Sequence, residues 1–258
     1  LIKLIGDILL YCKGEKNKMN SKMFREGLIS AYYRCLNSSY IHLDNDADYN
    51  TQFDEKTGTL FLLFQWTHST LDWWSNLDFF PRATKPYKNM DVTWKCHRGF
   101  LRVWKTIEPE VEARIKDPDV KRICCIGYSH GAAIAAFAHE YCWYHRPDIR
   151  KSIIGFGFGA PRIFFGHMDK SLKERWIKFF PIRSNNDIVT HVPPRLFGFR
   201  HVNDVTTFKN GGELIRKDGE EKWPKCVVSH TYHNYTQNIL YGEISGGLAN
   251  IEEDENER

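Results

Sequence analysis

The stretch from residue 122 to residue 131 most constrains how this chain can fold. It reads Arg-Ile-Cys-Cys-Ile-Gly-Tyr-Ser-His-Gly, an apolar run that ends in a Gly-x-Ser-x-Gly pattern. Four alanines between residues 132 and 136 follow, as is typical of a closely packed helix. We expect a buried strand, a sharp turn that exposes Ser129, and then a helix. Gly127 and Gly131 are expected where strand and helix come too close for a side chain.

The size and charge of the chain narrow its class. With 258 residues, 42% of them hydrophobic, it is long enough for one α/β domain with a sizeable core. We predict a single domain over residues 1–258, with an N-terminal extension at 1–19 and a disordered acidic tail at 250–258. The net charge is only +4, and the basic residues are scattered, which argues against a nucleic acid partner. No apolar run reaches the roughly 18 residues of a membrane-spanning helix.

Segments with helical and strand-like spacing alternate along the chain. Helices are expected at residues 20–37, 100–117, 132–143 and 231–241. Strands are expected at residues 59–66, 122–127, 152–158 and 176–182, and the polar stretch 44–56 is interpreted as a loop. This alternation predicts an α/β fold with a mostly parallel central sheet and helices on both faces.

The cysteines indicate a reducing compartment. There are seven, an odd number without paired spacing. Cys124 and Cys125 are adjacent in an expected strand and point to opposite faces, so they cannot bridge comfortably. We therefore predict free buried thiols and a cytoplasmic location. Secretion is the alternative if an N-terminal signal has been removed, since residues 1–12 are apolar apart from interruptions such as Asp7.

Three polar residues could form a catalytic triad. A serine hydroxyl needs a base to take its proton and a third group to orient that base. Asp187 follows a strand-like run and His230 lies near a helix start, so Ser129, Asp187 and His230 occur in the order that a strand-turn-helix serine site requires. His191 and His233 are rival bases, because His233 lies three residues after His230 and could share its helix face.

Other histidines give no sign of a metal centre. His68, His97 and His139 have no repeated ligand spacing with acidic residues or cysteines. We predict neither a metal site nor a cofactor.

Six blocks occur in a fixed order along the chain. They are Phe64–Asp78, His97–Leu101, Gly127–Gly131, Phe158–Arg162, Asp187–Val189 with Pro193 and Pro194, and His230–Tyr235. In order and composition they resemble the class 3 lipase family, the fungal triacylglycerol lipase type of α/β-hydrolase, over about residues 25–242. The resemblance implies that Ser129 cleaves carboxylic esters of lipids through an acyl-enzyme. A phospholipase A1 or lysophospholipase is the alternative. A catalytically silent relative that binds lipid or a partner protein is a second alternative.

The resemblance also implies roles for individual residues. Ser129 would be the nucleophile, Asp187 the orienting acid and His230 the base, a choice over His233 that the family's spacing to Tyr235 favours. The oxyanion hole would be formed by Thr67 and by the backbone N–H of His130. We expect the side chain of His130 to lie on the surface without a catalytic part.

The segment after the oxyanion threonine carries many apolar side chains. In the resembling family it forms a lid that covers the active site and opens at a lipid surface; ordinary packing of a helix on the core is the alternative. The partner is expected to be a lipid or small ester, with transient contact to a lipid surface. The lid or acyl pocket residues would be Trp66, Leu71, Trp73, Trp74 and Leu77. Trp66 stands where the family usually has glycine and is expected to narrow the acyl pocket.

Overall fold

An eight-stranded sheet forms the centre of the molecule. The structure, a computed structural model, describes residues 21–43, 48–65, 82–87 and 94–247. In sheet order the strands are β1 (Ile41–His42), β2 (Asp48–Asp54), β3 (Thr59–Gln65), β6 (Arg122–Tyr128), β7 (Ile153–Phe158), β9 (Phe179–Ser184), β11 (Thr206–Lys209) and β12 (Glu243–Ser245). The five strands from β3 to β11 run parallel, and β1, β2 and β12 add antiparallel edges. The predicted mostly parallel sheet is confirmed.

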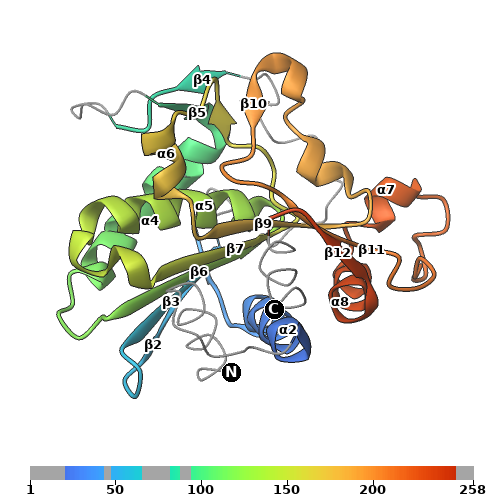
Figure 1. The fold of residues 1–258 in the computed structure, drawn as a ribbon, viewed down its shortest axis with the longest axis horizontal. Coiled ribbons are helices and arrows are strands. Elements are labelled where there is room, and N and C mark those ends of the chain that lie inside the picture. The colour runs from blue at the N-terminus through green and yellow to red at the C-terminus, as the bar shows by residue number, and fades with distance from the viewer. Residues whose placement is uncertain (1–20, 44–47, 66–81, 88–93, 248–258) are drawn as a thin grey trace, which may run out of the picture.

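The helices cover both faces of this sheet, as Figure 1 shows. They are α2 (Ser21–Asn37), α4 (Arg98–Ile115), α5 (His130–His145), α6 (Lys170–Arg175), α7 (Lys225–Val228) and α8 (Tyr232–Tyr241). The parallel strands follow one another across the sheet in chain order, and right-handed crossovers in one direction place all their helices on one face. Thus α4, α5 and α6 lie on that face, while α2 and α8 cover the other.

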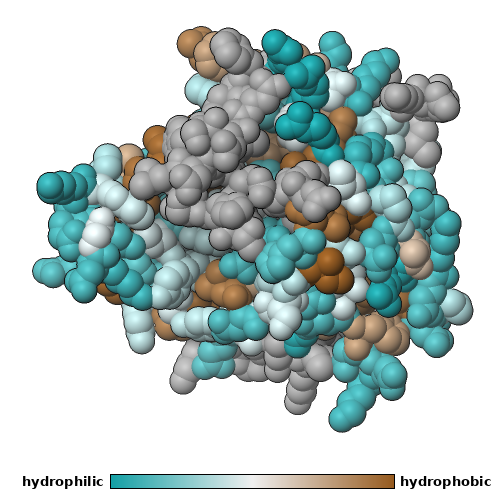
Figure 2. All heavy atoms as spheres, turned by 180° about the vertical axis from the view of Figure 1, so that it is seen from behind, coloured by the Kyte–Doolittle hydropathy of each residue, from teal (hydrophilic) through white to brown (hydrophobic). Residues whose placement is uncertain are grey.

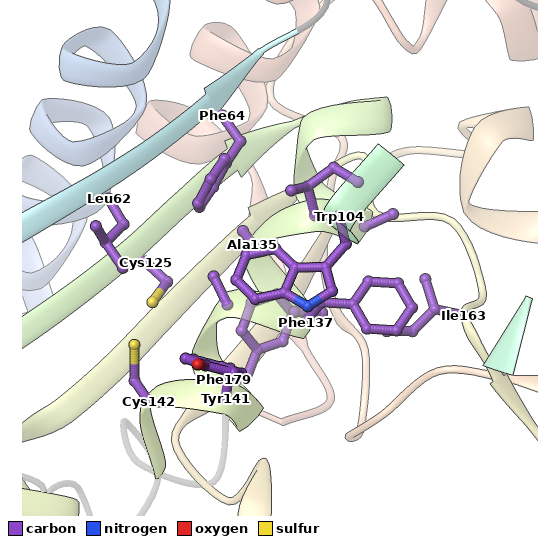
Figure 3. Packing of buried hydrophobic residues seen from close by; sticks show 14 of the residues in the cluster. Leu62, Phe64, Trp104, Cys125, Ala135, Phe137, Tyr141, Cys142, Ile163 and Phe179 are labelled. Carbon is purple, nitrogen blue, oxygen red and sulfur yellow. The ribbon is translucent and has the colours of Figure 1, made fainter. Parts of the chain in front are cut away.

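Two hydrophobic clusters, one on each face, hold these layers together. Along β3, Leu62 and Phe64 belong to the cluster under α4 and α5, whereas Leu63 belongs to the cluster under α2 and α8. Strand side chains alternate between faces, so a strand buried on both sides is apolar throughout. Figure 3 shows the first cluster, where β3 side chains approach Trp104 of α4 and Phe137 of α5.

The cysteines are arranged as the sequence predicts. Six cysteines in the described part of the chain are free, and five of them are buried. Cys124 and Cys125 face opposite clusters. In Figure 3 the sulfur atoms of Cys125 and Cys142 point toward each other.

A small second sheet stands above the α4–α5 face (Figure 1). Its order is β10 (Phe199–Arg200), β8 (Phe164–Phe165), β5 (Lys95–His97) and β4 (Ala83–Thr84). The connections include three short 3-10 turns, η1 (Pro147–Ser152), η2 (Ile188–His191) and η3 (Arg195–Phe197). Viewed from the opposite side, the described surface is mainly hydrophilic with small separated apolar patches (Figure 2). Among the described helices, none has the length and apolar character that crossing a membrane would require.

Two of the predicted secondary-structure elements are placed differently in the structure. The supposed loop at 44–56 contains β2, which pairs with β3 along its whole length. As a strand near the sheet edge, β2 is only partly buried, so its polar composition conceals it. The strand expected at 176–182 begins at Phe179 instead. Trp176 caps the C-terminus of α6 and is buried in the core cluster, where its indole nitrogen donates to the carbonyl of Ala136.

Candidate active site

Ser129 lies on a strained turn between β6 and α5. Its φ is 57° and its ψ is −123°, a conformation that costs a residue with a side chain roughly 1–3 kcal/mol. Its backbone N–H donates to the carbonyl of Phe158 at 2.8 Å, which ties the turn to β7. The serine is therefore held at the carboxyl end of the parallel strands, as the sequence predicts.

The two flanking glycines are required by close backbone contacts. A Cβ atom at Gly127 would lie 2.1 Å from the carbonyl oxygen of Gly131. A Cβ atom at Gly131 would lie 2.1 Å from the carbonyl oxygen of Phe64 in β3. Neither backbone atom can move aside like a flexible side chain, so both positions need glycine. The steric role predicted for the pair is confirmed, although Gly131 meets the neighbouring strand β3 rather than β6.

Ser129, His230 and Asp187 form a hydrogen-bonded chain. Nε2 of His230 lies 2.8 Å from Oγ of Ser129, and Nδ1 lies 2.8 Å from Oδ2 of Asp187. His230 lies between α7 and α8, and Asp187 directly precedes η2, just beyond β9. In this arrangement Nδ1–H donates to the carboxylate, and Nε2 is left to accept the serine proton. Asp187 is fully buried, whereas Ser129 is 8% exposed.

Asp187 is fixed by three donors. Its Oδ1 accepts a hydrogen bond from the backbone N–H of Val189 at 2.9 Å. Its Oδ2 accepts from His230 and also from the hydroxyl of Tyr235. Burial, followed by the charge of Asp187, raises the pKa of Tyr235 well above its usual value, so the phenol stays protonated and remains a donor. The carboxylate is thus held in one orientation although it is out of contact with water.

Two further residues shape the space around His230. The ring of Tyr128 stacks on the imidazole, with centroids 5.2 Å apart and planes 11° apart, and its hydroxyl donates to the carbonyl of His230. Gly159 has a φ of +65°, and a Cβ atom there would lie 2.6 Å from Cε1 of His230. A side chain at residue 159 would therefore displace the imidazole.

The structure separates His230 from its rivals. Nε2 of His233 lies 3.3 Å from the carbonyl oxygen of Ile215 and 3.5 Å from Oε2 of Glu220. His191 lies at the end of η2, and its buried Nε2 makes no hydrogen bond to the described residues. Only His230 among these three is brought to Ser129.

The expectation of a surface position for His130 is wrong. Its side chain is 1% exposed and packs on Phe100 of α4, with ring centroids 5.3 Å apart, because the first turn of α5 is buried under α4. Burial, followed by the charge of His97, lowers the pKa of His130 to about 3, so this imidazole is neutral near pH 7. Its backbone N–H belongs to the first residue of α5, at the positive end of the helix dipole.

Several predicted site residues lie outside the described residues. They are Trp66, Thr67, Leu71, Trp73, Trp74 and Leu77.

Sequence reasoning gave no role to Tyr128 or Gly159, and used Tyr235 only for its spacing. Tyr128 directly precedes the serine, and Gly159 lies in the Phe158–Arg162 block, so their positions beside recognised motifs were the available signal. The contacts that give them a role join segments far apart in the chain.

Comparison with known proteins places this architecture among lipases. The family model described as "Lipase (class 3)" matches residues 61–197, just over half of the chain. A lipase of Rhizopus niveus is 26% identical over 167 residues, which is 63% of this chain and 42% of the relative. A secreted mono- and diacylglycerol lipase of Malassezia globosa is 33% identical over 129 residues, or 47% of this chain and 38% of the relative. The match thus spans less than half the length of these curated relatives.

Solved structures share the fold. The triacylglyceride lipase of Rhizomucor miehei superimposes with a TM-score of 0.58 at 17% identity, covering 91% of this chain and 96% of that one. The predicted α/β-hydrolase fold is confirmed.

Proposed function

The chain belongs to the class 3 lipase family, and on that premise we propose that it is a serine hydrolase that cleaves carboxylic ester bonds of lipids. The relatives it matches are described as lipases, two of them as acting on triacylglycerides or on mono- and diacylglycerols. One observation carries the proposal: Ser129, His230 and Asp187 are joined by two hydrogen bonds of 2.8 Å each. A catalytically silent relative would have no need of this buried, fully oriented chain.

The geometry supports the two-step chemistry of serine esterases. Oγ of Ser129 attacks the ester carbonyl carbon while its proton moves to Nε2 of His230. The tetrahedral intermediate collapses, the bond to the alcohol oxygen breaks, and the alcohol leaves with the proton from Nε2. Water then attacks the acyl-enzyme by the same route, and the fatty acid and free Ser129 are released. Asp187 orients the imidazole of His230 and stabilises the imidazolium that forms.

The negative charge on the carbonyl oxygen needs donors in the transition state. The backbone N–H of His130, at the start of α5, is one proposed donor. Thr67 is the second proposed donor, an assignment that rests on its place in the family's block. Loss of one such donor typically costs about 10²-fold or more in rate.

Labelling and a substrate series test the proposed function. A fluorophosphonate probe is expected to label the wild-type protein on Ser129 and to leave Ser129→Ala unlabelled. Hydrolysis of p-nitrophenyl esters from acetate to palmitate then gives the acyl-chain preference. If the wild-type protein were neither labelled nor active, the alternative of a catalytically silent protein that binds lipid or a partner protein would be favoured. Release of fatty acid from a diacylphospholipid, but not from an acylglycerol, would favour the phospholipase alternative.

The relatives also bear on location. The Malassezia globosa relative is described as secreted, which supports the secreted alternative, and the cytoplasmic prediction gains no support from the relatives. Buried thiols are compatible with secretion, because burial raises the pKa of Cys35 to about 11 and that of Cys124 to about 12. A thiol that is rarely ionised reacts slowly with oxidants. Detection of the protein in the culture medium of its native host, and not in the cell lysate, tests secretion.

A further inference from the structure

A cavity of about 780 Å³ lies beside the turn that follows Asp187. Its walls come from α6 and the segment before it, from the end of β9, from the segment after β7, and from the segments that carry η2, η3 and β10 up to the start of β11. Five cationic side chains line it against a single carboxylate, that of Asp204. The cations are Arg162, Lys173, Arg183, Arg195 and Arg200. The cavity is therefore strongly positive.

The cations lack acidic partners. None of the five forms an ion pair with a carboxylate among the described residues. Arg162 donates through Nη1 to the carbonyls of His191 and Pro193, at 2.7 and 3.2 Å, and Arg183 donates through Nε to Oγ1 of Thr190 at 2.7 Å. Each of these two guanidinium groups thus donates through only one of its nitrogens, and the acceptors are uncharged oxygens. The remaining N–H groups make no hydrogen bond to the described residues, so they can serve a ligand in the cavity.

The like charges oppose one another. Burial lowers the pKa of Arg162, and the charges of Arg183 and Arg195 lower it further. Burial also lowers the pKa of His201 to about 3, so this lining imidazole is neutral near pH 7 and adds no further charge. Cations held together in a concave, partly buried site produce a strong local potential, and a bound anion relieves their repulsion.

We propose that this cavity binds a phosphate group. Guanidinium forks match the geometry of phosphate oxygens, and two half-buried arginines with unused donors lie in the wall behind three exposed cations at the rim. The volume is that of a site for a small molecule, which leaves room for the substituent of a phosphate ester. The shared chemistry fits a soluble phosphate ester and the head group of an anionic phospholipid alike.

The rim favours the phospholipid. In η3, Leu196 is 91% exposed and Phe197 is 51% exposed, and both lie between Arg195 and Arg200. In a lipid surface the phosphate groups lie directly above the acyl chains. Arginines that flank exposed apolar side chains could therefore contact the phosphates while the apolar side chains contact the acyl chains.

Binding measurements test the proposal independently of hydrolysis. Inorganic phosphate and glycerol 3-phosphate are titrated by calorimetry. Co-sedimentation is measured with two kinds of vesicle, one of phosphatidylcholine alone and one of phosphatidylcholine and phosphatidic acid in equal parts. The protein used is Ser129→Ala, so that no lipid is hydrolysed. The double variant Lys173→Ala/Arg195→Ala removes two rim cations whose side chains make no hydrogen bond to the described residues. The matched control is Arg102→Ala/Lys222→Ala, which removes two exposed cations that do not line the cavity.

We expect the rim variant to weaken phosphate binding by about tenfold or more, because each charge-assisted contact contributes about that much, while the control variant binds like the parent protein. Binding of the soluble phosphates with loss in the rim variant assigns the site to a soluble ester. Binding only to vesicles that contain phosphatidic acid, with the same loss, assigns it to a lipid head group. No binding of phosphate in any form, or equal binding by the rim and control variants, would overturn the proposal.

Discussion

The hydroxyl of Tyr235 donates a hydrogen bond to Oδ2 of Asp187, the same carboxylate oxygen that faces the imidazole of His230. Both partners are fully buried. Tyr235 lies in α8, five residues after His230, so the segment that supplies the proposed base also supplies a hydrogen bond that holds the proposed orienting acid in place. This relationship makes Tyr235 a positioning residue whose removal should affect the rate more than substrate binding.

Tyr235→Phe deletes this single donor and keeps the ring. We expect kcat to fall by about tenfold, in line with the loss of one hydrogen bond to a charged group, while KM changes little. Steady-state kinetics on a p-nitrophenyl ester measures both. Tyr241→Phe is the control, because Tyr241 lies in the same helix but is 74% exposed. An unchanged kcat in Tyr235→Phe would show that the clamp does not matter for turnover.

The proposed triad predicts unequal effects of two neighbouring histidines. Ser129→Ala and His230→Ala should each lower kcat by roughly 10⁴-fold or more, because triad members act as a unit. His233→Ala should stay within a few-fold of wild type, because Nε2 of His233 contacts the carbonyl oxygen of Ile215 and not the serine. Activity assays on variants with matched melting temperatures decide this. The assignment of the base would be refuted if His233→Ala were inactive while His230→Ala retained activity.

Gly159→Ala should inactivate the protein through one misplaced side chain. The new Cβ atom would lie 2.6 Å from Cε1 of His230, and a displacement of about 1 Å can cost about 10²-fold in rate. Gly219→Ala is the matched control, because its φ of +88° is also positive but a Cβ atom there meets open space. Both variants should lose about 1–2 kcal/mol of stability from backbone strain. Similar activity in the two variants would exclude the clash with His230.

Because the imidazole of His139 is buried, we expect the folded protein to lose stability in mild acid. Burial lowers its pKa to about 3, below the unfolded value near 6.5, so the unfolded chain binds a proton in this range that the folded protein does not. Stability is therefore greatest above pH 6.5 and falls as the pH drops toward 3, with about 2 kcal/mol lost to this group by pH 5. Urea denaturation at pH 7 and pH 5 measures the loss.

His139→Gln should make this pH dependence shallower by about 2 kcal/mol between pH 7 and pH 5, because it removes one of the buried imidazoles with a lowered pKa while His130 and His201 remain. His167→Gln is the control, since His167 is exposed and should leave the dependence unchanged. An equal loss of stability between pH 7 and pH 5 in wild type and His139→Gln would contradict the prediction.

The lid that the family resemblance implies for the segment after Thr67 predicts a dependence on the physical state of the substrate. If it is present, Trp73→Ser with Trp74→Ser should depress hydrolysis of emulsified or micellar esters far more than hydrolysis of a soluble short-chain ester, because the apolar side chains of such a lid would meet lipid when the site opens. The two substrates are assayed side by side with the melting temperature of the variant. Equal losses on both substrates would assign these tryptophans to core packing.

Local patterns in the sequence were enough to predict the central strand, the serine turn and the helix that follows. The run before Gly127 is apolar because β6 is buried on both faces, and this property is visible without any tertiary information. Strand β2 escaped detection because it is partly exposed and largely polar. His130 was misplaced because burial of its side chain depends on α4, a neighbour that no local pattern identifies.

By itself, the sequence determined the alternation of the main helices and strands, the candidate nucleophile and the residue types that could assist it, since these follow from periodicity and short motifs. Only the tertiary structure decided which histidine meets the serine and what surrounds it. Ser129 and His230 are 101 positions apart, and Asp187 is 43 positions from His230. The register of the parallel strands brings these residues to one edge of the sheet, and positioning within about 3 Å depends on long-range packing that no local pattern records.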